Sequence, residues 1–425
     1  MKLTPLLALA VIMAFVYLLR TRKAAVISVG SAGLVVLVAL SMILLPEPSF
    51  KAAARGLTVW WEIVLPALLP FFIAAELLMG MGIVHFMGVF MEPLMRPLFN
   101  VPGAGSFAFA MGLASGYPLG ASLSARLKEG GLATKTEAER LMCFCNTSDP
   151  LFMSGAVAVG MFKRVDIGPI LLIGHYVSAI TVGMLLRFWR RKSPQSPPLD
   201  GEERGFIVAR AYRSMRNAQR KNPKPFGEIL GAAVNKSVTA LLMILGFIVL
   251  SSVVFEILRS YGVAGLLSSA ISKVVPERII PQALHESLVS GLFEITIGCS
   301  MAGQATSPLM ARVALVGGLI AWSGLSVHAQ VAAVIHSAKL SVWPYVASRG
   351  LQGILAGLFT YALMTRDPMR WALPAFEPHA ITGSLAWFDN LGSATGTCLG
   401  LIGLMAVIPL IFTAIHTIRN AAKGR

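Results

Sequence analysis

Long apolar runs separated by short charged segments dominate this chain. A helix needs about 20 apolar residues to cross the hydrocarbon of a bilayer, and several runs come close to or exceed that length. They lie near residues 3–19, 24–45, 57–83, 166–188, 229–257, 343–364 and 393–417. The runs lack the period-2 alternation of barrel strands, and helices satisfy their own backbone groups in lipid. The pattern therefore predicts an all-α polytopic membrane protein.

Other apolar stretches are interrupted at short intervals. They carry Gly, Ser, Asn, Pro and single charges too often for a plain lipid-facing span, and lie at residues 101–127, 147–162, 284–305 and 307–338. Irregular backbone at bilayer depth is tolerated only where it is buried in protein or lines a polar cavity. We therefore expect broken helices or re-entrant hairpins that are buried among complete spans.

Basic residues at the ends of the apolar runs predict the orientation. Arg20, Arg22 and Lys23 follow the first run, and residues 187–224 form a long segment rich in Lys and Arg. Because basic loops stay in the cytoplasm, both segments and the basic end at 419–425 should be cytoplasmic, with the N-terminus outside. The first run is followed by a second apolar run rather than by a small-residue cleavage site, so we expect a retained transmembrane helix and not a signal peptide.

This orientation requires an odd number of crossings in each half of the chain. Two such units enter the membrane from opposite sides and form an inverted repeat. The predicted division follows in chain order. It consists of two N-terminal transmembrane helices (1–56), a first repeat (57–190), a basic cytoplasmic linker (191–228), a second repeat (229–365), and an outer loop with a C-terminal transmembrane helix (366–425).

Internal similarity between the halves supports the repeat. A shift of 175 positions without a gap pairs Phe72 with Phe247 and Ser148 with Ser323. The same shift pairs the dipeptide at 115–116 with that at 290–291. Corresponding positions of the two halves are therefore expected to lie at corresponding breaks.

Composition narrows the class of protein further. Of 425 residues, 56% are hydrophobic and only 13% are charged, and the mean hydropathy is +0.72. A water-soluble globule carries about a quarter of charged residues, so the chain is excluded from that class. The net charge of +16 arises from Lys and Arg beside the apolar runs, which the positive-inside rule explains without a nucleic acid partner.

One basic stretch has a pattern of its own. Between residues 204 and 220 Arg recurs every three to six positions, with Phe206, Ile207, Tyr212 and Met215 interleaved. A basic amphipathic helix on an anionic leaflet fits this pattern. Membrane lipid is therefore an expected partner, whereas RNA binding would need more than one short stripe.

The first candidate site is a predicted helix break. Gly112, Gly116 and Gly120 recur every four residues, a spacing that permits close helix packing. Pro118 removes a backbone donor and disfavours helical geometry at Tyr117. The break would leave backbone groups near Ser115, Gly116 and Tyr117 free to coordinate a polar or anionic solute. The alternative is a tightly packed kink without a ligand.

The second candidate is the polar cluster Asn146, Thr147 and Ser148, followed by Asp-Pro. Taken alone, it is typical of a helix N-cap with proline at the first helical position. Its place in the repeat indicates a role beyond capping. Ser148 corresponds to Ser323 in the second half, which is followed by His328 and Gln330 in another apolar run.

Glu294 is the third candidate, as the only charge between Glu286 and Arg312. An ionisable residue inside a membrane segment is costly and points to function. Glu294 could bind a cation, carry a proton or hydrogen-bond a polar substrate, and the alternative is pairing for packing only. We expect it near the bilayer middle, close to the other two candidates. A further pair of acidic residues, Glu62 and Glu76, stands on one predicted helix, with Glu62 expected at a membrane end.

Catalytic and metal-binding motifs are missing from the sequence. The chain has no H-E-x-x-H, G-x-S-x-G or Walker-type motif, and His285-Glu286 lacks its second histidine. We therefore predict no enzyme, no cofactor and no metal site. Cys143, Cys145, Cys299 and Cys398 form no C-x-x-C pair and are expected to be buried structural thiols.

These motifs resemble a known family. The segments that carry the resemblance are Ser115-Gly116-Tyr117-Pro118-Leu119-Gly120-Ala121, Glu137-Ala138-Glu139-Arg140-Leu141 and Cys145-Asn146-Thr147-Ser148-Asp149-Pro150-Leu151-Phe152. They are similar to the YlbJ-type sporulation integral membrane proteins of spore-forming bacteria. Residues 290–294 and 318–330 resemble the second Gate, or nucleoside-recognition, unit that this family shares with concentrative nucleoside transporters, spore maturation membrane proteins and the FeoB iron transporter. The resemblance covers residues 57–365.

The resemblance implies two Gate repeats and a transporter-like permease for an unidentified small polar solute, needed for spore cortex formation. A coupling ion and sporulation membrane proteins are the partners it suggests. The alternative is a scaffold that moves nothing and recruits partners through residues 187–228. Nucleoside transporters place Asn, Gln and Glu at their hairpins, but the full substrate motifs are not matched here. The expected substrate site consists of Ser115, Gly116, Tyr117, Asn146, Thr147, Ser148, Glu294, Ser323 and Gln330.

Overall fold

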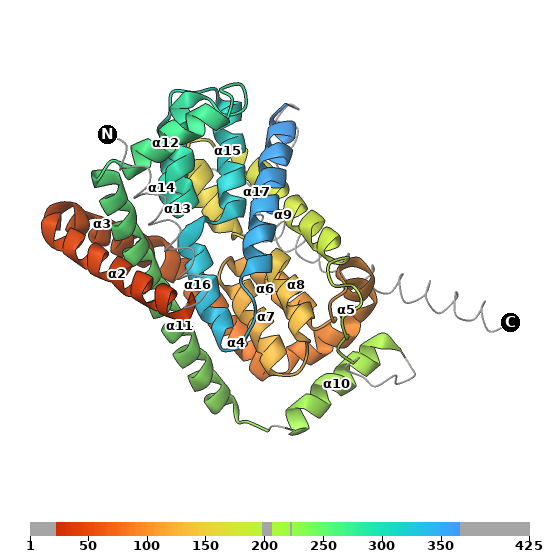
Figure 1. Cartoon of the computed structure of the whole chain (residues 1–425). Coiled ribbons are helices and arrows are strands. Elements are labelled where there is room, and N and C mark those ends of the chain that lie inside the picture. Colours follow the sequence, from red (N-terminus) through yellow and green to blue (C-terminus); the bar gives the residue numbers. More distant parts are fainter. Residues whose placement is uncertain (1–22, 198–205, 222, 366–425) are drawn as a thin grey trace, which may run out of the picture.

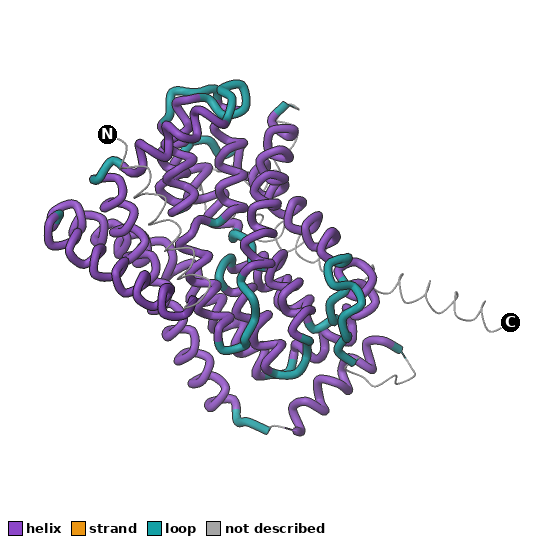
Figure 2. The backbone as a smooth tube through the Cα atoms, in the orientation of Figure 1, coloured by secondary structure: helices purple, strands orange, loops and turns teal. Residues whose placement is uncertain are grey.

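The computed structural model describes residues 23–197, 206–221 and 223–365 (Figure 1). The predicted first and last transmembrane helices, the outer loop before the latter, and Cys398 lie outside these ranges. Within them all regular secondary structure is helical (Figure 2). The all-α prediction is thereby confirmed.

Several described helices are long and apolar enough to cross a membrane. They are α9 (Ile167–Leu186), α11 (Phe226–Ser260) and the stretch Leu309–His336. Two further spans arise if each of two bent pairs counts as one, namely Val29–Leu44 with Pro46–Glu62, bent by 106°, and Leu68–Gly80 with Ile83–Phe99, bent by 84°. The chain is therefore polytopic, as its hydropathy predicts.

The first half of the chain begins with long helices and continues with short, interrupted ones. Their bounds are α2 (Lys23–Leu44), α3 (Pro46–Val59), the π-helical turn η1 (Trp60–Val64), α4 (Leu65–Gly80), α5 (Ile83–Phe99), α6 (Gly105–Ser115), α7 (Leu119–Glu129), α8 (Lys135–Cys145), the π-helix η2 (Leu151–Met161) and α9.

The second half follows after the linker helix α10 (Ile207–Lys221). Its elements are α11, α12 (Val263–Val274), the short η3 (Gln282–Leu284), α13 (His285–Phe293), α14 (Ile295–Gln304), α15 (Leu309–Trp322), α16 (Gly324–His336) and α17 (Trp343–Met364).

The two halves run through the same order of elements. A long helix turns at a left-handed glycine, Gly82 with φ 77° and Gly262 with φ 75°, into an amphipathic helix. Two interrupted helices follow, α6/α7 and α8/η2 in the first half, α13/α14 and α15/α16 in the second. A complete helix, α9 or α17, closes each half. The repeat that the weak sequence similarity at a shift of 175 positions suggests is thus present in the order of the helices.

Contacts between the halves come in matched pairs. Helix α7 packs on α16 as α14 packs on η2, and α8 packs on α17 as α15 packs on α9. Helices α9 and α17 pack on each other (Figure 1). If the two halves are exchanged, the first contact of each matched pair becomes the second. An approximate two-fold relation between the halves requires this correspondence. The interface between the repeats therefore gathers both sets of helix breaks.

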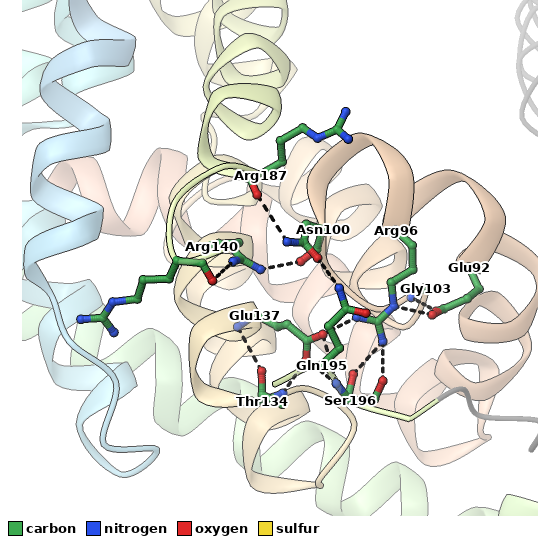
Figure 3. A network of polar contacts seen from close by, with 11 residues as sticks. Glu92, Arg96, Asn100, Gly103, Thr134, Glu137, Arg140, Arg187, Gln195 and Ser196 are labelled. Atoms are coloured by element: carbon green, nitrogen blue, oxygen red, sulfur yellow. Dashed lines mark hydrogen bonds and ion pairs between the residues drawn. The ribbon is translucent and has the colours of Figure 1, made fainter. Parts of the chain in front are cut away.

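The first residues of the linker between the repeats contact the first repeat. Arg96 of α5 donates to the carbonyl and hydroxyl oxygens of Ser196 at 2.7 and 3.0 Å, and pairs with Glu137 of α8 (Figure 3). Gln195 donates to the side chain of Asn100 at 2.8 Å. Buried Arg140 donates to the backbone carbonyls of Trp189 and Arg190, just after the end of α9. The start of the predicted linker is therefore fixed to the first repeat.

Candidate functional site

The break predicted near Tyr117 is present. Helix α6 ends at Ser115, Gly116 has φ +81°, the Tyr117–Pro118 peptide bond is cis, and α7 begins at Leu119. A Cβ atom at Gly116 would lie 3.0 Å from the backbone nitrogen of Asp149. Since only glycine adopts this φ readily and leaves this space, the first break can lie directly against the second.

The glycine spacing has a specific packing role. A Cβ atom at Gly112 would lie 1.8 Å from the carbonyl oxygen of Cys145, and one at Gly120 would lie 2.2 Å from the same atom. Both glycines therefore let α6 and α7 close around the C-terminal end of α8. Three described cysteines, Cys143, Cys145 and Cys299, are buried and form no disulfide with one another, as expected for structural thiols.

The second break lies between α8 and η2. Thr147 donates to the carbonyl of Gly112 at 3.0 Å, and the amide of Ser148 donates to Nε2 of His175 at 3.0 Å. The carboxylate of Asp149 accepts the amide of Phe152 at 2.8 Å. This last contact is the N-cap arrangement that the local sequence predicts.

Breaks at corresponding places divide the second repeat. Glu294 separates α13 from α14 in an extended conformation, and its carboxylate accepts the amide of Ile297 at 2.9 Å and the hydroxyl of Thr296. Ser323, with φ 71°, separates α15 from α16. Glu294 is thus an N-cap as well as a carboxylate that is only 6% exposed.

One tyrosine connects the breaks of the two repeats. The side-chain amide of Asn146 donates to the hydroxyl of Tyr345 at 2.8 Å, and the hydroxyl of Ser323 lies 3.4 Å from the same oxygen. Fully buried Arg349, one turn further along α17, donates to the carbonyls of Asn146, at 2.9 Å, and Cys143. These contacts fix the two polar turns beside each other.

A pocket of about 470 Å³ opens beside these breaks and is lined by both repeats. Most of its wall is apolar. Its polar and acidic lining residues are Glu62, Tyr117, Asp149, Glu294, Thr296, Ser326 and Gln330. No lysine, arginine or histidine belongs to the described lining. The wall thus offers carboxylates, hydroxyls and an amide, and no positive charge.

Two of these polar side chains make no hydrogen bond to a described residue. Ser326 and Gln330 are each 4% exposed, stand one turn apart on α16, and make no side-chain hydrogen bond within the described chain. Buried polar groups are nearly always hydrogen-bonded in folded proteins. Their free donors and acceptors therefore face the pocket and are available to a bound molecule or to water.

The expected site residues divide into two groups. Tyr117, Glu294 and Gln330 line the pocket. The others are buried and do not belong to the described lining; they are Ser115, Gly116, Asn146, Thr147, Ser148 and Ser323. The structure therefore brings all three candidate segments together, while only part of the predicted set reaches the cavity.

Other lining residues were not singled out as ligands from the sequence. Asp149 follows the Asn146–Ser148 cluster and was interpreted only as part of a cap. Ser326 could have been found from its position four residues before Gln330, which places both on one helix face. Glu62 lies on η1, and no sequence signal links it to this pocket. Among the described residues, no group of three His, Cys, Asp or Glu side chains could hold a metal ion.

Comparisons with known proteins match the chain to a family model and to two relatives. The Gate family, described as "Nucleoside recognition", matches residues 61–165. The sporulation integral membrane protein YlbJ of Bacillus subtilis (strain 168) is 40% identical over 384 residues, which cover 89% of this chain and 93% of that protein. An uncharacterized protein of Alkalihalophilus pseudofirmus is 31% identical over 152 residues, 35% of this chain and 30% of its own. No solved structure matches the chain.

Proposed function

Because the chain belongs to the family of the sporulation integral membrane protein YlbJ, we propose that it is a transporter-like permease needed for spore cortex formation, whose solute binds in the pocket between the repeats. The observation that carries the proposal is the pair of polar side chains Ser326 and Gln330, each 4% exposed, which line the same pocket as the carboxylate of Glu294 and make no hydrogen bond to a described residue. A polar solute would supply the hydrogen bonds that these groups lack.

The lining narrows the chemistry of the solute. Glu62, Asp149 and Glu294 offer acceptors and negative charge, and no described basic residue of the wall offsets them. An anionic solute would meet repulsion in a partly apolar pocket, where charges are poorly screened. The solute should therefore be neutral or cationic, with N–H or O–H donors for the carboxylates. The pocket's volume lies within the range of about 300–1,000 Å³ that is common for small-molecule sites.

The arrangement of the breaks supports movement as well as binding. Both repeats place irregular backbone at the pocket, and repeats of this kind can rock against each other around a fixed site. The proposal includes the orientation expected from the basic segments, with the N-terminus outside and the C-terminus in the cytoplasm. It leaves the coupling ion open, since a carboxylate such as Glu294 can bind a cation or carry a proton.

Thermal unfolding of the detergent-purified protein tests the proposal. We expect nucleosides, amines or other uncharged or cationic solutes to raise the unfolding temperature, and nucleotides and other anions to leave it unchanged. Gln330→Leu should abolish the shift. Leu325→Met, an exposed position on the same helix, is the matched control.

The scaffold alternative makes the opposite prediction. It gains support if no solute in the screen changes the unfolding temperature and if Gln330→Leu cells form spores with normal cortex. A shift caused by anions only would contradict the argument from the acidic lining.

A further inference from the structure

The outer face of α10 is the strongest feature that the proposed pocket leaves unexplained. Helix α10 buries Ile207, Ala211 and Ser214 and packs against α5 (Figure 1). These three positions share one side of the helix. The helix is therefore part of the folded protein, with a fixed face turned outward.

The outward face combines apolar and basic side chains. Val208, Tyr212, Arg216 and Arg220 are all exposed and follow one another at intervals of four, so they form a single stripe. Tyr212 is 54% exposed, and Phe206 just before the helix is 66% exposed. Exposed aromatic and aliphatic groups together with arginines give this face both the apolar contacts and the positive charge by which a surface helix binds anionic lipid.

No carboxylate among the described residues pairs with the exposed basic side chains near the C-terminal end of this face. Residues 206–227 contain no aspartate or glutamate. Arg216, Arg220 and Lys221 are exposed and form no ion pair with a described carboxylate. A partner with several negative charges and some apolar surface complements this face.

The length of the following helix, α11, supports a position of α10 near a bilayer surface. Helix α11 has 35 residues and begins at Phe226, directly after the short connection from α10. At 1.5 Å per residue it is about 50 Å long, whereas the hydrocarbon is about 30 Å thick. At least one end of α11 is therefore expected to project beyond the hydrocarbon, and α10 precedes its N-terminal end in the chain.

We propose that the outer face of α10, formed by Phe206, Val208, Tyr212, Arg216, Arg220 and Lys221, binds the headgroups of anionic phospholipids. The basic side chains contact lipid phosphates, and the aromatic side chains insert among the upper acyl carbons. The fixed start of the linker at Ser196 and the packing on α5 hold this face against one leaflet. The inference does not depend on the pocket or on transport.

Lipid binding by the full-length protein tests this surface. Protein purified in a nonionic detergent is titrated with phosphatidylglycerol or phosphatidylcholine, and bound lipid is counted by native mass spectrometry. Each basic residue near an anionic surface contributes about fivefold in affinity. We expect wild-type protein to prefer phosphatidylglycerol at least tenfold, and R216Q/R220Q/K221Q to lose that preference.

A matched variant controls for net charge. Arg259, Lys273 and Arg278 are exposed near the other end of α11 and on the following segment, so R259Q/K273Q/R278Q removes the same charge far from α10. It should keep the wild-type preference. Equal loss in both variants, or no loss in the α10 variant, overturns the proposal.

Further measurements separate the sources of the anion and do not depend on a variant. Raising the ionic strength from about 0.1 M to about 1 M shortens the Debye length from about 10 Å to about 3 Å, and should weaken phosphatidylglycerol binding by wild-type protein. Displacement of the lipid by millimolar inorganic phosphate would show a soluble-anion site. Binding of an RNA oligonucleotide without lipid preference would show a nucleic acid surface. Either result overturns the proposal.

Discussion

Asn146 in the first repeat donates a hydrogen bond of 2.8 Å to the hydroxyl of Tyr345 in the second repeat, although 199 positions separate them. Both side chains are fully buried. The contact joins the turn after α8 to the start of α17, so the polar turns of the two repeats are held at one place. It also explains why the pocket draws its lining from both halves.

Removing the tyrosine hydroxyl should loosen this junction. Tyr345→Phe leaves the amide of Asn146 buried with a donor unpaired, and an unsatisfied buried group costs about 1–3 kcal/mol. We expect a lower unfolding temperature in detergent for this variant. Tyr361→Phe, at a position that is 51% exposed on the same helix, should unfold as the wild type does. Equal unfolding temperatures for all three proteins would contradict a structural role of the hydroxyl.

The close approach at Gly112 gives a second prediction. Gly112→Ala places a methyl group within 1.8 Å of the Cys145 carbonyl, which is backbone and cannot step aside. Overpacking of this kind costs about 1–3 kcal/mol. Gly231→Ala on α11, where a Cβ atom meets nothing within 4 Å, should not destabilise the protein. Thermal unfolding of both variants measures the difference, and a stable Gly112→Ala protein would contradict the close packing of Gly112 against the Cys145 carbonyl.

Glu294 serves as a cap and lines the pocket, and substitution separates the two roles. Glu294→Gln keeps an oxygen that can accept the amide of Ile297, so the protein should accumulate and unfold normally. It removes the negative charge, and we expect loss of solute-induced stabilisation and of sporulation. Glu294→Ala also removes the cap, at a cost of about 1 kcal/mol, and should lower the unfolding temperature as well.

Glu286→Gln provides the matched control, because Glu286 is exposed and lies outside the described pocket lining. It should sporulate like the wild type. Normal sporulation and protein level in both Glu294 variants would show that the carboxylate has no functional role, and the scaffold alternative would gain.

The local sequence was sufficient to predict where the helices break. Pro118 and the neighbouring glycines predict the first interruption, and α6 ends at Ser115 as expected. The cluster before Pro150 predicts a cap, and Asp149 forms it. Such features depend on the conformational limits of proline and glycine and on side chains a few residues away. For that reason they can be recognised without knowledge of the fold.

Which of these residues would reach the pocket could not be predicted in the same way. Asn146 and Ser323 carry polar side chains that could bind a solute, yet both contact the hydroxyl of Tyr345 on α17. No local sequence pattern indicates that α17 takes part in the site. Glu62 lies far from the other lining residues in the chain and joins them only through the packing of η1 and α11 beside the breaks.

By itself, the sequence determined that the protein lies in a membrane, that it is helical, where its helices are interrupted, and that two similar halves follow each other. These features could be predicted because hydropathy, proline and glycine act over one or two helical turns. Only the tertiary structure decided that Glu294, Gln330 and Asp149 share one cavity. It also decided that Arg349 donates to backbone carbonyls at the C-terminal end of α8. Those contacts join residues that are distant in sequence. The packing of the two repeats on each other brings them together, and no local pattern encodes that packing.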